Sequence, residues 1–74
     1  MQTVQIVTEY IKLDQLLKFS QTAESGAMAR TIIFDGIVTV NGVDCLERGK
    51  KIYPGDIVTV DYEGFVDTLA VEKG

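Results

Sequence analysis

The sequence predicts an α+β domain in which two short helices pack on a small, mostly antiparallel, twisted sheet. Three observations support this prediction. Apolar residues recur at helical spacing in two stretches before residue 36, an Asn-Gly pair follows a β-branched run, and a Pro-Gly-Asp turn precedes a further β-branched run. Because the chain has 74 residues, of which 46% are hydrophobic, we expect one folded domain over residues 1–74.

The first predicted elements are a strand and a helix. Residues 3–7 alternate apolar and mostly polar side chains, which predicts a short strand with one buried side, and we place this strand at an edge of the sheet. From Leu13 the apolar spacing becomes helical, since Leu16 and Leu17 fall on the same face of a helix. This spacing predicts a short amphipathic helix.

A second helix is predicted after a short connection. We expect Ser25 to be the N-cap, because its hydroxyl can accept a hydrogen bond from an otherwise unpaired backbone N–H. Ala29, Ile32 and Ile33 then form an apolar stripe at helical spacing. We expect Gly36 to end this helix, because glycine readily takes the left-handed conformation that follows a last helical turn.

The second half of the chain predicts a hairpin and a further strand. Residues 37–40 are β-branched, and the Asn-Gly pair at 41–42 predicts a type I′ turn that returns the chain antiparallel over residues 43–46. The Tyr-Pro-Gly-Asp sequence at 53–56 suits a type II turn, which has proline at its second position and glycine at its third. Residues 57–62 form the last predicted strand.

The C-terminal extension, residues 61–74, has apolar residues whose spacing fits neither a helix nor a strand well, so the sequence leaves its packing open. The extension also holds most of the surplus negative charge. It contains one basic and four acidic residues, whereas the whole chain has 7 basic and 11 acidic residues and a net charge of −4. The rest of the chain is close to neutral and can present one positive surface, although whole-molecule attraction to a polyanion would be weak.

The composition argues against an enzyme and against a metal site. The chain has no histidine and one cysteine, so it lacks the commonest general base, an internal disulfide and the ligands of a zinc site. Cys45 alternates with Asp44 on a predicted strand and is expected to be a small core residue. No window approaches the roughly 20 apolar residues that span a bilayer, and the N-terminus has no leader pattern. We therefore expect a cytoplasmic protein that uses no membrane, cofactor, metal or small-molecule substrate.

Small and basic residues are the candidate binding groups. The start of the second helix, at Ser25 and Gly26, leaves backbone N–H groups unpaired, and Gly26 would let a phosphate approach them closely. Arg30 lies four residues after Gly26 on the same side of the helix, so it could reach the same phosphate. Lys12 stands at the start of the first helix, where a cation opposes the helix dipole. With the basic loop between the hairpin and the last strand, the predicted phosphate-binding residues are Lys12, Ser25, Gly26, Arg30, Arg48, Lys50 and Lys51.

Four segments resemble the S-four RNA-binding domain, a family named after ribosomal small-subunit protein four. The segments are Lys12–Leu17, Ala23–Arg30, Ile33–Gly42 and Tyr53–Val58, and the resemblance covers about residues 11–60. Each segment alone is a weak signal, but the order and spacing of all four are specific. The chain looks most like the small stand-alone, YaaA-like members, in which the domain is the whole protein.

The resemblance implies the fold of that family, its alpha-L motif, and binding of structured RNA, often ribosomal. It places the binding face on the two helices and the loop before the last strand, and it implies no catalysis. A ribosomal or other protein partner is compatible with it. This chain departs from the family pattern at Gly26, where many members have arginine, and at Thr39 and Val43, which are often basic in relatives. Fewer cationic contacts are therefore available.

Two alternatives stay open at the level of the sequence. A protein-docking adaptor that kept the fold and lost RNA affinity would agree with the acidic balance. The second half of the chain also resembles small ubiquitin-like sulfur carriers, although those proteins end in Gly-Gly and this sequence ends in Glu72-Lys73-Gly74. The tyrosines at positions 10, 53 and 62 are expected to be structural, with stacking of Tyr53 on a base as the alternative.

Overall fold

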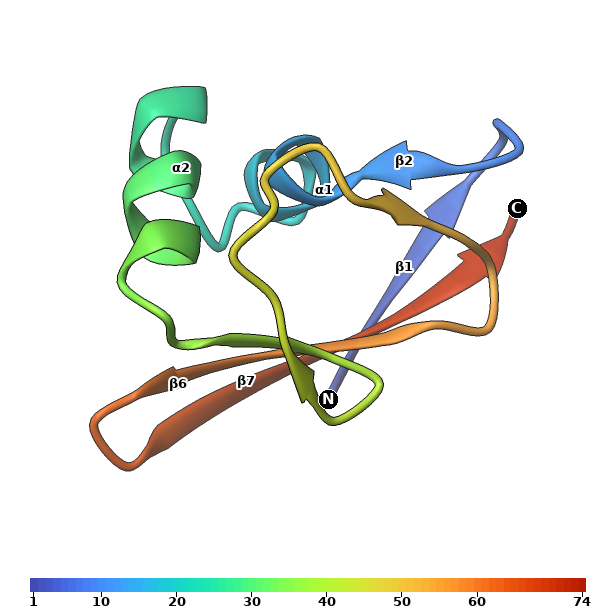
Figure 1. The fold of residues 1–74 in the computed structure, drawn as a ribbon. Helices are drawn as coiled ribbons and strands as arrows, with labels where there is room; N and C mark the ends of the chain where they lie inside the picture. The colour runs from blue at the N-terminus through green and yellow to red at the C-terminus, as the bar shows by residue number, and fades with distance from the viewer.

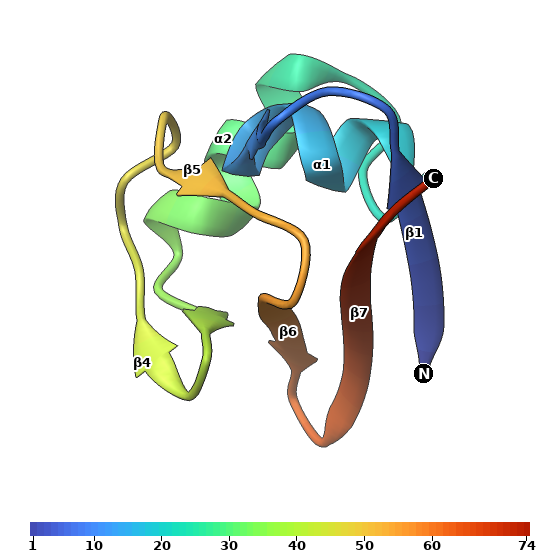
Figure 2. The same cartoon turned by 90° about the vertical axis from the view of Figure 1, so that its right-hand side faces the viewer.

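The computed structural model describes residues 1–74 as an α+β domain, with two helices on one side of a five-stranded sheet (Figures 1 and 2). The sheet has the order β1-β7-β6-β3-β4, and β2 and β5 form a separate two-stranded sheet. The predicted fold class is confirmed. In chain order the elements are β1 (Gln2–Ile6), β2 (Ile11–Lys12), α1 (Leu13–Phe19), α2 (Gly26–Phe34), β3 (Val38–Val40), β4 (Val43–Asp44), β5 (Lys51–Ile52), β6 (Ile57–Tyr62) and β7 (Phe65–Lys73).

The C-terminal extension, whose packing the sequence left open, contains the end of β6 and the whole of β7, an interior strand of the main sheet. β7 runs parallel to β1 on one side and antiparallel to β6 on the other. Val71 is the register partner of Val4 in β1, and Leu69 is the partner of Val58 in β6. All four side chains are buried. β7 therefore joins the first strand of the chain to the rest of the sheet, and β1 lies at an edge, as expected.

The hydrophobic core lies between the helices and the main sheet. One cluster of 17 buried residues includes the predicted apolar faces of both helices and the inward-facing residues of the strands. Cys45 belongs to this cluster, which agrees with its expected role as a small core residue. The largest fully buried side chains are Leu13, Leu16, Leu17, Ile33, Ile52, Leu69, Val38, Val58, Val60 and Val71.

The predicted helix cap and hairpin turn are confirmed by their backbone geometry. The Ser25 hydroxyl accepts the backbone N–H of Met28 at 3.1 Å, so Ser25 is the N-cap of α2. Gly36 follows the last turn of α2 with φ of +78°, in the left-handed region. Asn41 and Gly42 have φ of +52° and +83°, as a type I′ turn requires, and they connect β3 to β4.

The predicted turn at residues 53–56 is also present. Gly55 has φ of +99°, and the Asp56 N–H donates to the Tyr53 carbonyl at 3.0 Å. The Asn41 side chain donates to the Asp56 carboxylate at 3.0 Å, so this turn is connected to the β3–β4 turn. β6 then spans residues 57–62, with the predicted limits.

Candidate nucleic-acid interface

Two lysines lie directly opposite each other in the small β2–β5 sheet. The register pairs Ile11 with Ile52 and Lys12 with Lys51. Ile52 is fully buried and anchors the pair to the core, whereas both lysines are exposed. Like charges at directly opposed positions of an antiparallel pair are destabilising. We call Lys12 and Lys51 the cationic pair.

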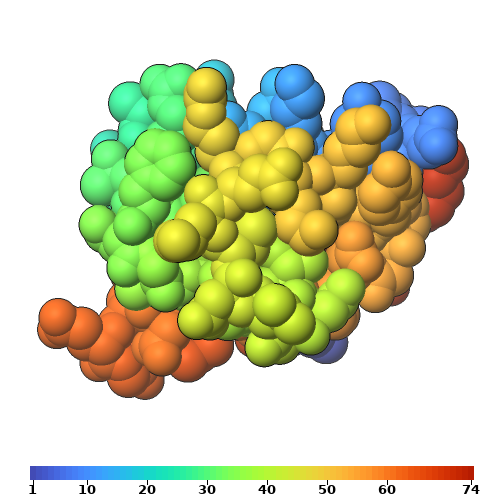
Figure 3. Space-filling model, in the orientation of Figure 1, coloured from blue at the N-terminus to red at the C-terminus, as the bar shows by residue number.

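The basic loop is fixed to the start of α1 by backbone hydrogen bonds. The N–H groups of Leu13 and Asp14 donate to the carbonyls of Lys50 at 2.9 Å and of Arg48 at 3.0 Å. These are first-turn N–H groups that have no partner inside a helix. In Figure 3 the loop, drawn in yellow, lies between α2 in green and β2 in blue. The exposed Arg48 side chain therefore belongs to the same part of the surface as the cationic pair.

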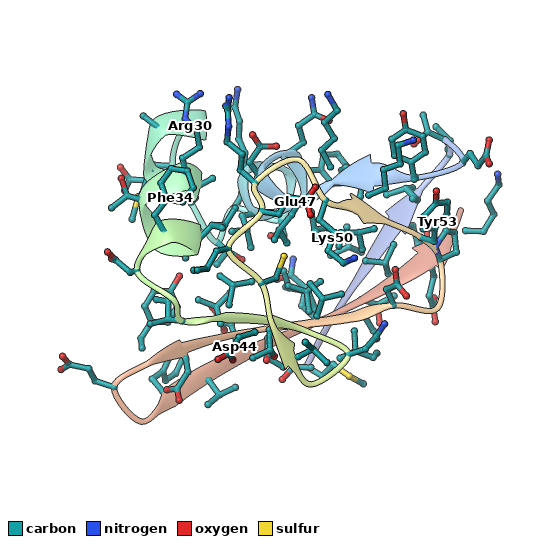
Figure 4. The ribbon with its side chains drawn as sticks, in the orientation of Figure 1. Arg30, Phe34, Asp44, Glu47, Lys50 and Tyr53 are labelled. Carbon is teal, nitrogen blue, oxygen red and sulfur yellow. The ribbon has the colours of Figure 1, made fainter.

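The start of α2 supplies the remaining predicted groups. Because Ser25 caps the Met28 N–H, the N–H groups of Gly26 and Ala27 precede the first intrahelical bond and have no partner within the helix. Gly26 has open space around the position of a Cβ atom. Arg30 is exposed on the same helix, and Figure 4 shows it at the upper end of α2, far from Asp44.

Lys50 is separated from the other cations. It is half-buried and lines a hollow with Asp44 and Glu47, together with apolar residues of β3, β4 and the loop. Figure 4 shows Lys50 beneath the loop, nearer the sheet, whereas Arg30 extends from α2. The structure therefore brings Lys12, Lys51 and Arg48 together, with Arg30 and the start of α2 across the loop, whereas Lys50 lines a hollow that also contains Asp44 and Glu47.

Carboxylates gather at the opposite end of the molecule, which we call the acidic end. Two adjoining hollows of about 350 and 460 Å³ are lined by Asp35, Asp44, Asp61 and Glu63. They lie beside the β6–β7 turn, which is at the lower end of Figures 1 and 2, whereas β2 and β5 are at the upper end. Burial, and then the nearby Asp67 carboxylate, raise the pKa of Tyr62 at this end.

Tyr10 was not among the candidate residues, although the structure places it beside the cationic pair. Its ring centroid is 5.8 Å from that of Tyr53, with the planes tilted by 48°. The Lys51 ammonium lies 4.9 Å from the centre of the Tyr10 ring. No local pattern predicts this cluster, because it depends on the pairing of β2 with β5.

No group of three or more His, Cys, Asp or Glu side chains is arranged to hold a metal ion. No helix combines the length and the apolar character that crossing a membrane requires.

A family model described as the S4 domain matches residues 4–66. The chain belongs to the S4 domain family. This is the S-four family that the four sequence segments resemble, and the recognition is confirmed. The S4 domain match is wider than the expected residues 11–60, because it includes most of β1 and the start of β7.

One relative of this S4 domain and one solved structure with the same fold are informative. A protein of Bacillus subtilis (strain 168), described as probable ribosome maturation protein RlbA, is 40% identical over 62 residues, which are 84% of this chain and 84% of that protein. The solved trimeric structure of Vibrio cholerae Heat Shock Protein 15 has the same fold, with a TM-score of 0.76 and 24% identity. That match covers 89% of this chain but 66% of the Heat Shock Protein 15 chain, so this S4 domain spans about two thirds of its length.

Proposed function

We propose that this chain is a non-catalytic, cytoplasmic RNA-binding module. Its ligand is structured RNA, which is either ribosomal RNA or the RNA of a ribosome precursor. The binding face consists of Lys12, Arg48 and Lys51, with Ser25, Gly26 and Arg30 at the start of α2, and Lys50 is a peripheral member.

The cationic pair is the observation that carries this proposal. The register places Lys12 directly opposite Lys51, and like charges at such positions destabilise an antiparallel pair. The chain has 7 basic and 11 acidic residues, yet two of its cations face each other here. A bound phosphate would convert this repulsion into two attractive contacts. RNA supplies a regular series of such phosphates.

The second part of the face adds neutral donors to these cations. The free N–H groups at Gly26 and Ala27 suit a phosphate oxygen, and the helix dipole favours an anion there. Since few cations are available, recognition of RNA shape has to contribute strongly, as it does for double-helical RNA. Membership of the S4 domain family and the likeness to a probable ribosome maturation protein support ribosomal RNA as the target.

The test is in-cell crosslinking followed by sequencing of the bound RNA. The double variant Lys12→Gln/Lys51→Gln removes the cationic pair while keeping long polar side chains. We expect it to lose most of the crosslinked ribosomal RNA. With purified protein and a short RNA hairpin, the slope of log affinity against log salt should fall by about 0.7–0.9 per charge removed.

The matched control is Lys18→Gln/Lys73→Gln, which removes the same number of charges from two exposed lysines outside the proposed binding face. We expect this variant to retain most crosslinking. Equal crosslinking of wild type and the Lys12/Lys51 variant, both folded by circular dichroism, would refute the proposed face. Recovery of a protein partner after nuclease treatment, with no RNA crosslinked to wild type, would instead identify an adaptor.

A further inference from the structure

Tyr53 presents an exposed aromatic surface next to the cationic pair. Its side chain is 42% exposed, although its ring contacts that of Tyr10. Tyr10 is half-buried, and the Lys51 ammonium lies over its ring at 4.9 Å. The two tyrosines therefore differ, because Tyr10 supports Tyr53 and Lys51 while Tyr53 keeps the open surface.

The backbone at Tyr53 is held rigidly. Its N–H donates to the Asp56 carboxylate at 2.8 Å, and its carbonyl accepts the Asp56 N–H at 3.0 Å. The Gly55 N–H donates to the Val71 carbonyl at 2.8 Å, which fixes the turn to β7, an interior strand of the main sheet. Pro54 further restricts the turn. A ring held in this way loses little conformational entropy when a flat ligand stacks on it.

We propose that Tyr53 is a stacking platform for one unpaired base of the bound RNA. This inference rests on the proposed function, and it names the part of the RNA that lies beyond the paired region. A base has an aromatic face of suitable size, and stacking on a tyrosine tolerates any base. The phosphate that flanks the base would lie near Lys51, whose ammonium is held by Tyr10 and not by a carboxylate. The preferred ligand is a helix with a bulged or terminal unpaired nucleotide.

The binding test uses three synthetic RNA hairpins with the same stem. One has a fully paired stem, one carries a single bulged adenosine, and one carries an abasic nucleotide at the bulge. At fixed salt we expect wild type to bind the adenosine bulge about tenfold more tightly than the abasic bulge. Tyr53→Leu should remove that preference, whereas Tyr53→Phe should keep it because the phenyl ring still stacks.

A fluorescence measurement reports stacking independently of affinity. The chain contains no tryptophan, so Tyr53→Trp introduces a single tryptophan, which can be excited selectively in the presence of the two remaining tyrosines. We expect its emission to be quenched by the adenosine-bulged hairpin and to change much less with the abasic hairpin. Tyr62→Trp, at the acidic end, is the matched control, and its emission should not respond to either RNA.

The outcomes separate the two proposals. Equal wild-type affinity for the adenosine and abasic bulges, with no difference in quenching at position 53, overturns the stacking platform and leaves RNA binding intact. A failure of wild type to bind any of the three hairpins at low salt overturns the proposed function, and the stacking platform with it.

Discussion

Lys12 and Asp35 each occupy a helix end where their charge is unfavourable. Lys12 is the N-cap of α1 and makes no side-chain capping bond, and Asp35 is the C-cap of α2. A cation at a helix N-terminus and an anion at a helix C-terminus each interact unfavourably with the helix dipole, by roughly 0.3–1 kcal/mol. Helix stability therefore does not explain these two residues. Their placement does put positive charge at the upper end of the molecule and negative charge at the acidic end.

Tyr62 gives a prediction about stability at high pH. Burial, and then Asp67, raise its pKa in the folded state above the ordinary value of about 10. As pH rises through about 10, the unfolded chain loses the phenol proton first, so the folded state holds more protons and stability falls. The contribution of Tyr62 is thus fully present below pH 10 and is lost above it. Tyr62→Phe should flatten this fall in urea unfolding measured from pH 8 to pH 11.

The control for this prediction is the comparison below pH 9, where any difference between Tyr62→Phe and wild type should be constant. Parallel stability curves for the two proteins above pH 10 would show that Tyr62 does not cause the decline.

At the scale of elements, Ser25 has two separable roles, one in capping α2 and one in the proposed binding face. Ser25→Ala should destabilise the protein by about 1 kcal/mol, because the Met28 N–H loses its acceptor. In a domain of this size, that corresponds to a fall in Tm of roughly 4–8 °C.

Ser25→Asp should retain wild-type stability, since aspartate is an equally good N-cap, while its negative charge repels phosphate and weakens RNA binding. Thermal unfolding and RNA titration of both variants measure these effects. Unchanged RNA affinity in Ser25→Asp would remove the start of α2 from the binding face.

The position of β7 between β1 and β6 predicts which of its apolar residues matter for stability. Leu69 is 1% exposed and lies opposite Val58, so Leu69→Ala should cost about 2–5 kcal/mol. Val66 lies in the same strand but is 54% exposed, and Val66→Ala should stay within about 0.5 kcal/mol. Urea unfolding at neutral pH compares the two variants. Equal losses of stability in the two variants would contradict a β7 in which Leu69 is packed in the core and Val66 is not.

Elements defined by local signals were visible in the sequence, and β7 was not. The N-cap at Ser25, the helix end at Gly36 and the Asn-Gly turn each act within a few residues, and all are confirmed. In β7 the apolar residues Phe65 and Val66 are exposed, at 65% and 54%, so they obscure the alternation of the buried residues that follow. The partner β1 also lies at the other end of the chain, where no local pattern indicates the pairing.

The candidate residues were visible individually, but their arrangement was not. β2 and β5 have two residues each, which is too short to show alternation, so the pairing of Lys12 with Lys51 could not be predicted. Adjacent residues in an extended chain point to opposite sides. This geometry explains why Lys51 is exposed while Lys50 is half-buried, although the sequence suggested one basic cluster.

At the scale of the whole molecule, the proposed binding face and the acidic end lie at opposite ends of the fold. The cationic pair and Arg48 lie at the upper end, and the carboxylates Asp61 and Glu63 line the hollows of the acidic end (Figures 1 and 4). A chain with a net charge of −4 can therefore present a local anion-binding face. The acidic end should also repel RNA that approaches in the wrong orientation.

This arrangement predicts a salt-dependent effect of the acidic end. The longest extent of the molecule is 31 Å. The Debye length is about 30 Å at 0.01 M salt and about 8 Å at 0.15 M salt. RNA on the binding face would therefore be repelled by the acidic end only at low salt. Asp61→Asn/Glu63→Gln should raise the affinity for a short RNA hairpin several-fold at about 0.01 M salt and leave it unchanged at 0.15 M salt. The asparagine keeps an acceptor for the Gly64 N–H, which Asp61 now binds at 3.2 Å, so the turn should persist.

Glu47→Gln provides the comparison for this effect, because Glu47 lies in the basic loop itself. Within about one Debye length of the RNA, its charge should act at both salt concentrations, and its neutralisation should raise affinity in both titrations. If Asp61→Asn/Glu63→Gln and Glu47→Gln raise the RNA affinity equally at 0.15 M salt, RNA lies against the acidic end. RNA would then bind across the β6–β7 turn, and the proposed position of RNA on the binding face would be wrong.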